Sequence, residues 1–189
     1  MVLLLLATML GGRLAEHAGA AAGLRSVRQL SREDTDDCSG FVRAIYGREG
    51  VDLRAPQASP GENGVALIHR LARERRALRR SPRPGDLVFF RNTYRPGLSH
   101  VGIVDGVRGS QISFVHRTHT GIVRSRLDLR RPHARDLNDV LRGGPRRALT
   151  GELLAGFASP DHFRLRGKIP VGEDGRIDGH RFRRAVADR

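Results

Sequence analysis

The chain has 189 residues, of which 39% are hydrophobic and 29% charged, so it suits one ordinary domain with a sizeable core rather than a disordered chain or a polytopic membrane protein. Its single cysteine, Cys38, excludes an intrachain disulfide and a zinc site made of paired cysteines. The formal net charge of +14 predicts attraction to polyanions such as nucleic acid or an anionic cell envelope, but with 5% aromatic residues and no tryptophan we expect no specific nucleic-acid partner.

The N-terminal segment, residues 1–22, has two interpretations. An apolar run over residues 2–10 has signal-peptide length, and Ala18-Gly19-Ala20 is similar to a cleavage site, which would mean export to the periplasm or the cell exterior. No basic residue precedes the run, and an N-terminal helix buried in the core is the other interpretation. Because a spanning helix needs about 20 apolar residues, we expect no integral membrane span.

The first clear element of the predicted main domain, residues 24–163, is a short helix over residues 38–47. Asp37 is suited to cap its start and Gly47 to end it. Four residues share one face of this helix at spacings of i, i+3, i+4 and i+7: Cys38, Phe41, Val42 and Ile45. The helix should therefore pack on the core and carry the cysteine in its first turn.

The rest of the main domain predicts one more helix and then strands. A proline-containing loop over residues 52–63 leads to an amphipathic helix with a basic face over residues 65–78. Runs rich in Val, Ile and Phe predict strands at residues 87–90, 100–107, 111–116 and 121–127, the second and third forming a hairpin. Further segments are a last strand or short helix at residues 151–158 and a basic C-terminal tail at residues 164–189. This order predicts an α+β fold, with helices packed on one side of a small antiparallel sheet.

Two histidines are expected near one end of this sheet. His100 begins one strand of the hairpin and His116 ends the next, so antiparallel pairing brings them together. A cysteine at a helix start is a useful nucleophile when an imidazole can take its proton, and a second imidazole can orient the first. His119 is an alternative orienting residue. Other interpretations are a buried, inert Cys38 and a metal site made of Cys38, His100 and His116, although the latter lacks closely spaced ligand pairs.

Four blocks of sequence together resemble the NlpC/P60 family, the papain-like cysteine peptidases of bacterial cell walls, to which the CHAP amidases are related. The blocks are DCSGFVRAIY at residues 37–46, RPGDLVFF at 83–90, SHVGIV at 99–104 and FVH at 114–116. They follow the family's order and lie within the region from about residue 36 to residue 129. The resemblance implies a papain-like fold with the catalytic cysteine at a helix N-terminus.

The resemblance also implies roles for individual residues. Cys38 matches the nucleophile, His100 the general base and His116 the residue that orients the base, while Asp37 and Ser39 match positions that line the pocket for the amino end of the substrate. The implied reaction is hydrolysis of an amide bond in a peptidoglycan stem peptide through a thioester intermediate, without a cofactor. The implied partner is the peptidoglycan peptide itself.

Several alternatives remain open at this point. The same fold could serve a CHAP-type N-acetylmuramoyl-L-alanine amidase, an acyltransferase, a non-catalytic cell-wall-binding domain or a basic domain that binds nucleic acid nonspecifically. The chain also departs from the family pattern. The stretch before the Asp-Cys pair, residues 29–36, lacks the aromatic and glycine residues found in many members, and the spacing between His100 and His116 is longer than usual.

Overall fold

The computed structural model describes residues 2–141 and 147–163 of the chain, and the predicted tail at residues 164–189 lies outside them. The helices are α1 (Val2–Ala21), η1 (Val27–Gln29), α2 (Cys38–Gly47), α3 (Gly64–Glu74), α4 (Thr150–Leu153) and η2 (Pro160–His162). The strands are β1 (Leu78–Arg79), β2 (Leu87–Arg91), β3 (Leu98–Arg108), β4 (Gln111–Thr118), β5 (Gly121–Asp128), β6 (Val140–Leu141), β7 (Ala148–Leu149) and β8 (Leu154–Ala158).

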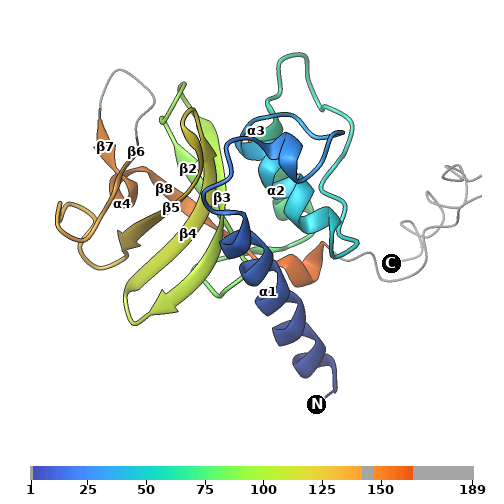
Figure 1. The fold of residues 1–189 in the computed structure, drawn as a ribbon, viewed down its shortest axis with the longest axis horizontal. Helices are drawn as coiled ribbons and strands as arrows, with labels where there is room; N and C mark the ends of the chain where they lie inside the picture. Colours follow the sequence, from blue (N-terminus) through green and yellow to red (C-terminus); the bar gives the residue numbers. More distant parts are fainter. Residues whose placement is uncertain (1, 142–146, 164–189) are drawn as a thin grey trace, which may run out of the picture.

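Six of these strands form one antiparallel sheet in the order β1-β8-β2-β3-β4-β5, and β6 pairs with β7 separately (Figure 1). The predicted strands and the β3–β4 hairpin are confirmed, and most extend beyond their predicted ends. The last predicted segment contains both proposed structures, since α4 leads directly into β8. The α+β class predicted from the order of elements is therefore confirmed.

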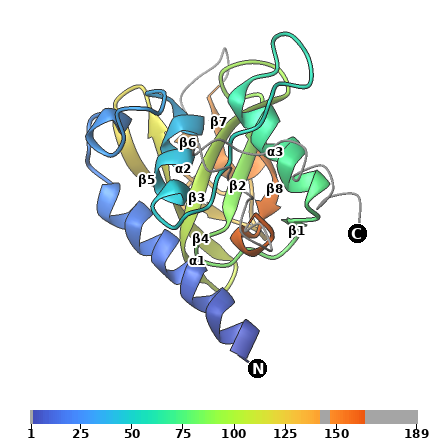
Figure 2. The same ribbon diagram turned by 90° about the vertical axis from the view of Figure 1, so that its right-hand side faces the viewer.

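Both faces of the sheet are covered, which explains why the run Leu87-Val88-Phe89-Phe90 is continuously hydrophobic. Leu87 and Phe89 face a core shared with α1, α2 and α3, whereas Val88 and Phe90 face a second core on the opposite side. The second core includes Leu141 of β6 and contacts Leu153 of α4. Figures 1 and 2 show the three longer helices together on one side of the sheet, as predicted, and Figure 1 shows the short α4 on the other.

The second half of α1 packs tightly into the first core. Leu10, Leu14 and Ala18 are at most 1% exposed. Glu49, just after α2, accepts one hydrogen bond from Arg13 at 2.7 Å and lies 3.0 Å from Nε2 of His17. This part of the predicted segment at residues 1–22 is thus a buried helix in the structure, and export stays a prediction.

The two helices nearest the predicted site differ in how well their ends were predicted. α2 begins and ends as predicted, with the Asp37 carboxylate accepting the Gly40 N–H. The predicted end of α3 at residue 78 is wrong. The helix ends at Glu74 because the backbone turns to a positive φ of 53° at Arg76, and Leu78 instead pairs with β8 at the sheet edge.

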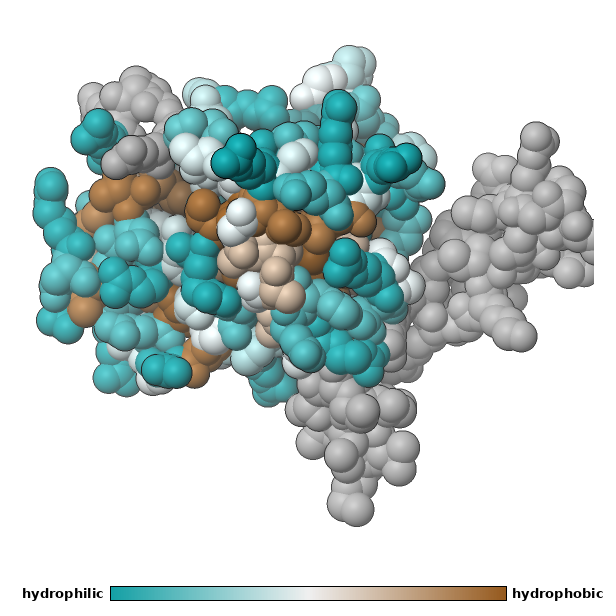
Figure 3. All heavy atoms as spheres, viewed as in Figure 1, coloured by the Kyte–Doolittle hydropathy of each residue, from teal (hydrophilic) through white to brown (hydrophobic). Residues whose placement is uncertain are grey.

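The surface of the described residues is mostly hydrophilic, as expected for a chain in which 29% of the residues are charged. Figure 3 shows a face covered mostly by hydrophilic residues, with hydrophobic residues gathered in part of its upper half. None of the helices within residues 2–141 and 147–163 combines the length and the apolar character needed to cross a membrane.

Candidate active site

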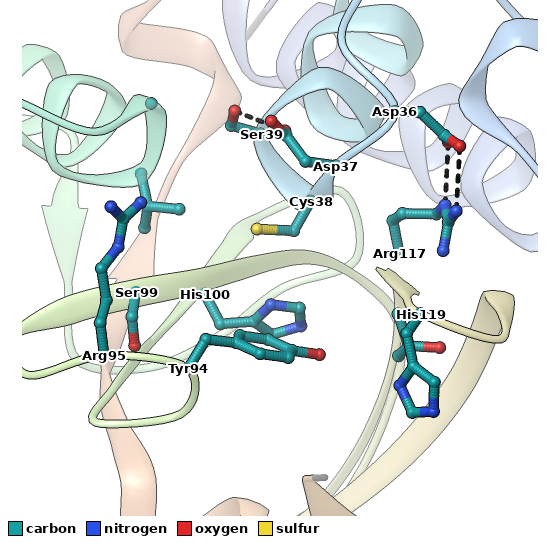
Figure 4. Close-up of a pocket in the computed structure, with 13 residues that line it drawn as sticks. Asp36, Asp37, Cys38, Ser39, Tyr94, Arg95, Ser99, His100, Arg117 and His119 are labelled. Atoms are coloured by element: carbon teal, nitrogen blue, oxygen red, sulfur yellow. Dashed lines mark hydrogen bonds and ion pairs between the residues drawn. The ribbon is translucent and has the colours of Figure 1, made fainter. Parts of the chain in front are cut away.

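A pocket of about 490 Å³ lies at the N-terminal end of α2 (Figure 4). Its walls come from the segment before α2, the start of α3, the β2–β3 loop, the start of β3 and the end of β4. The lining residues are Asp36, Asp37, Cys38, Ser39, Gly64, Val65, Tyr94, Arg95, Ser99, His100, Arg117, Thr118 and His119. The pocket therefore contains four of the five predicted site residues, and the fifth, His116, is buried against His100.

Cys38 is the first residue of α2 and lies at the pocket surface. The tight turn before it requires glycine at position 40, because a β-carbon there would collide with the carbonyl oxygen of Thr35. Burial raises the pKa of the Cys38 thiol to about 11, although the backbone N–H of Val101 opposes this shift, and the charge of Asp37 raises it further. The thiol is thus protonated at neutral pH and needs a base to become nucleophilic.

The two predicted histidines form a buried pair. Nε2 of His100 lies 2.7 Å from Nδ1 of His116, and Nε2 of His116 lies 3.0 Å from Oγ of Ser125. Burial lowers the pKa of His100 to about 4, and burial together with the neighbouring imidazole lowers that of His116 as well. Both rings are therefore neutral at pH 7. Within the described structure, Nδ1 of His100 is buried and has no hydrogen-bond partner, so one ring nitrogen remains available to accept a proton.

Gly102 lets the two histidines approach each other. It shares a strand face with His100, and a β-carbon at this position would lie 2.8 Å from the Val115 carbonyl oxygen and 3.1 Å from Cβ of His116. Any larger residue would force β3 and β4 apart. This close packing is the physical reason for glycine in the SHVGIV block.

Asp37 and Ser39, the predicted substrate-binding residues, also bind each other. The Ser39 hydroxyl donates to Oδ1 of Asp37 at 2.7 Å, and the Gly40 N–H donates to the same atom at 2.8 Å. Burial raises the pKa of Asp37, but these donors and that of Thr35 outweigh it, and the net pKa is lowered. A carboxylate therefore stays charged at the pocket beside Cys38, where it can attract a positively charged group.

This arrangement of a helix-terminal cysteine and two paired histidines agrees with the comparison of the chain with known families. Residues 26–137, more than half of the chain, match the NlpC/P60 family. The chain belongs to the NlpC/P60 family.

Three relatives each match a part of the chain. They are a gamma-DL-glutamyl hydrolase of Bacillus subtilis, 33% identical over 70 residues, and the probable endopeptidases p60 of Listeria innocua and Listeria grayi, 38% and 35% identical over 72 residues. These alignments cover 37–38% of this chain and 12–15% of the relatives. The chain thus matches only a small part of each relative's length.

An aromatic residue reaches this NlpC/P60 pocket from a loop that contains none of the predicted site residues. Tyr94, between β2 and β3, is 42% exposed, and its ring centroid lies 5.4 Å from that of His100 (Figure 4). Reciprocal bonds between Asn92 and Gly97 close the loop. The turn-forming residues Asn92 and Gly97 were the available signal, but no local pattern shows that this turn lies beside Cys38.

An ion pair that no sequence pattern predicted lies at the pocket edge. Arg117 of β4 donates from Nε and Nη2 to the two carboxylate oxygens of Asp36, at 2.9 and 3.0 Å (Figure 4). Asp36 also accepts the N–H of Val27, and these donors lower its pKa. The pair joins the segment before α2 to the strand that carries His116.

The geometry gives less support to His119 as the orienting residue and to a metal site. His119 lines the pocket, but the hydrogen bond to His100 comes from His116. Among the residues that the structure describes, no group of three or more His, Cys, Asp or Glu side chains is placed to hold a metal ion.

Proposed function

We propose that this NlpC/P60 protein is a cysteine hydrolase that cleaves an amide bond in peptidoglycan stem peptides. One observation carries the proposal. A cysteine at a helix start lines one pocket together with a neutral histidine, one of whose nitrogens has no partner among the described residues, and a second histidine is hydrogen-bonded to the first. The family and the names of the relatives, hydrolase and endopeptidase, support the same class of reaction.

In the proposed first half-reaction, Nδ1 of His100 takes the proton of the Cys38 thiol as the sulfur attacks the carbonyl carbon of the amide. The developing oxyanion is stabilised by the backbone N–H of Cys38, at the positive end of the α2 dipole. The His100 imidazolium then gives its proton to the amide nitrogen, the C–N bond breaks and the amine leaves. A thioester on Cys38 remains.

In the second half-reaction, water replaces the amine. His100 takes a proton from this water, whose oxygen attacks the thioester carbonyl, and the C–S bond breaks with return of the proton to sulfur. The products are a carboxylic acid and an amine, and the enzyme returns to its initial state. Nδ1 of His116 holds the His100 ring throughout by accepting a hydrogen bond from the Nε2–H of His100.

The charges of the pocket favour a zwitterionic or acidic peptide. The Asp37 carboxylate suits the free amino end of a stem peptide, while Arg95 provides positive charge elsewhere on the pocket wall. A relative named for gamma-DL-glutamyl hydrolysis supports a γ-linked glutamate as part of the substrate. We therefore favour an endopeptidase over an amidase. The net charge of +14 would hold the enzyme near an anionic envelope, and export of the protein would bring it there.

The proposal is tested by digesting purified peptidoglycan with the full chain and with Cys38→Ala, followed by identification of the products by mass. We expect the wild type to release stem-peptide fragments and Cys38→Ala to release none. Release of the intact peptide from muramic acid would instead assign the amidase activity. Identical digests from both proteins would contradict the proposed nucleophile. Ser31→Ala serves as the matched control. Ser31 precedes the residues that line the pocket, which begin at Asp36, so this variant should retain full activity.

A further inference from the structure

A serine on β5 extends the chain of hydrogen bonds behind the proposed base. Ser125 pairs with Phe114 in the β4–β5 register, so its side chain lies on the same face of the sheet as that of His116. Its Oγ is 3.0 Å from Nε2 of His116, and Nδ1 of His116 is 2.7 Å from Nε2 of His100. The three side chains belong to residues at most 8% exposed, so water hardly competes for these bonds.

In this series of hydrogen bonds, the position of one proton determines the positions of the other protons, because each neutral imidazole carries one N–H and one lone pair. For His100 to accept a proton at Nδ1, its own proton must be on Nε2 and be donated to Nδ1 of His116. His116 then carries its proton on Nε2 and must donate it. In the described structure, the atom in position to accept it is Oγ of Ser125.

We infer that Ser125 is a positioning residue that stabilises the tautomers of His116 and His100 in which His100 can act as a base. The inference rests on the proposed function, and Ser125 acts through the two histidines without touching the substrate. In the reverse arrangement, His116 donates from Nδ1 to Nε2 of His100. His100 then carries its proton on Nδ1 and has no lone pair to offer the thiol of Cys38.

Removal of the hydroxyl should favour the unproductive arrangement. With alanine at position 125, a proton on Nε2 of His116 would be a buried donor without an acceptor, and such donors are rare in folded proteins because they are costly. Moving that proton to Nδ1 leaves an unpaired lone pair instead, which costs less. The same change removes a hydrogen bond that would strengthen as His100 becomes positively charged.

The test compares the full-length wild type with Ser125→Ala, Ser125→Thr and Ser113→Ala. Threonine retains the hydroxyl and suits a β-strand. Ser113 lies on β4 one residue before Phe114, on the opposite face of the sheet, and is half-buried, so it controls for loss of a hydroxyl from the sheet. The measurements are kcat and KM on peptidoglycan fragments, thermal unfolding, and the ¹⁵N chemical shifts of the imidazole nitrogens, which distinguish the two tautomers without turnover.

We expect Ser125→Ala to lower kcat at least about 10-fold with little change in KM, as suits partial loss of base catalysis. The ¹⁵N shifts should move His116 from the Nε2–H to the Nδ1–H tautomer. Ser125→Thr and Ser113→Ala should retain most activity and the wild-type tautomer. Unchanged kcat and unchanged ¹⁵N shifts in folded Ser125→Ala would overturn the inference. If the wild type were inactive on peptidoglycan, the proposed function would fail, and the ¹⁵N shifts alone would still decide the role of Ser125.

Discussion

For individual residues, the environments of Cys38 and His100 indicate how the proposed nucleophile would be activated. Burial raises the pKa of the thiol to about 11 and lowers that of His100 to about 4, so the neutral forms of both groups predominate at pH 7. This differs from a resting thiolate–imidazolium ion pair. In the proposed mechanism, the proton must then move to His100 during attack on the substrate, and His100 would act as a general base in the strict sense.

This interpretation predicts that kcat/KM falls on the acidic side only at an unusually low pH. His100 works as a base only when neutral, and with its pKa at about 4 the activity should fall only as the pH approaches that value, well below the usual histidine pKa of 6.5.

Alkylation of Cys38 by iodoacetamide should be slow at pH 7 and accelerate toward the thiol pKa of about 11. Rapid alkylation that is constant between about pH 5 and pH 8 would indicate a resting ion pair and contradict this mechanism.

Among the structural elements, the proposed mechanism depends on how α2 is held against the sheet. The proposed nucleophile comes from the start of α2, whereas the proposed base and the histidine proposed to orient it come from β3 and β4. The paired hydrogen bonds from Arg117 to Asp36 join these two units across 81 positions of sequence, next to the pocket. The planar guanidinium matches the carboxylate with two bonds, which a lysine cannot do.

We therefore predict that Arg117→Lys lowers kcat severalfold and destabilises the fold by about 1 kcal/mol, since both side chains are partly exposed and the bond is only partly replaced. The expected cause is a less fixed distance between α2 and β4. Kinetics and denaturant unfolding measure the two effects. Arg126→Lys is the matched control, because that arginine on β5 is 63% exposed in its side chain and pairs with Asp139 at 3.5 Å. Equal effects of both substitutions would argue against a special role for the Asp36–Arg117 pair.

The elements that local sequence patterns predict correctly are those whose cause is local. α2 follows from a capping aspartate and a repeated hydrophobic face, and the β3–β4 hairpin follows from two adjacent hydrophobic runs, so Cys38, His100 and His116 could be placed from sequence. The insertion of β8 between β1 and β2 could not, because strand order depends on contacts between distant segments. Tyr94 and Ser125 could not be predicted for a different reason: Ser125 is only nine positions from His116 along the chain, and Tyr94 is close to His100, but neither residue belongs to a recognisable sequence motif.

At the scale of the whole molecule, a sheet covered on both faces buries ionisable groups along with the hydrophobic ones. The buried pair of histidines lies at one end of β3 and β4. Asp86, in the RPGDLVFF block before β2, is 1% exposed, and burial raises its pKa to about 6 although the N–H of Arg83 and the guanidinium of Arg79 oppose the shift. These groups make the stability of the fold depend on pH in opposite directions.

The sign of each contribution follows from which state binds more protons. Unfolded histidines take up protons near pH 6.5, whereas His100 in the folded protein does so only near pH 4, so the histidines reduce stability as the pH falls through this window. Asp86 behaves oppositely. Its folded pKa of about 6 exceeds the ordinary value of 3.8, so between these pH values the folded state binds a proton that the unfolded state does not. The contribution of Asp86 to stability is therefore present at low pH and lost as the pH rises through about 6.

Asp86→Asn should therefore make the protein more sensitive to acid. Asparagine retains an acceptor for the Arg83 N–H, which donates to Asp86 at 2.7 Å, but it cannot gain a proton as the pH falls. The Tm of Asp86→Asn should consequently fall more steeply than that of the wild type between about pH 6.5 and pH 4, as measured by thermal unfolding at a series of pH values. Asp136→Asn, at an exposed carboxylate, should reproduce the wild-type slope. Parallel slopes for Asp86→Asn and the wild type would mean that Asp86 does not bind a proton preferentially in the folded state.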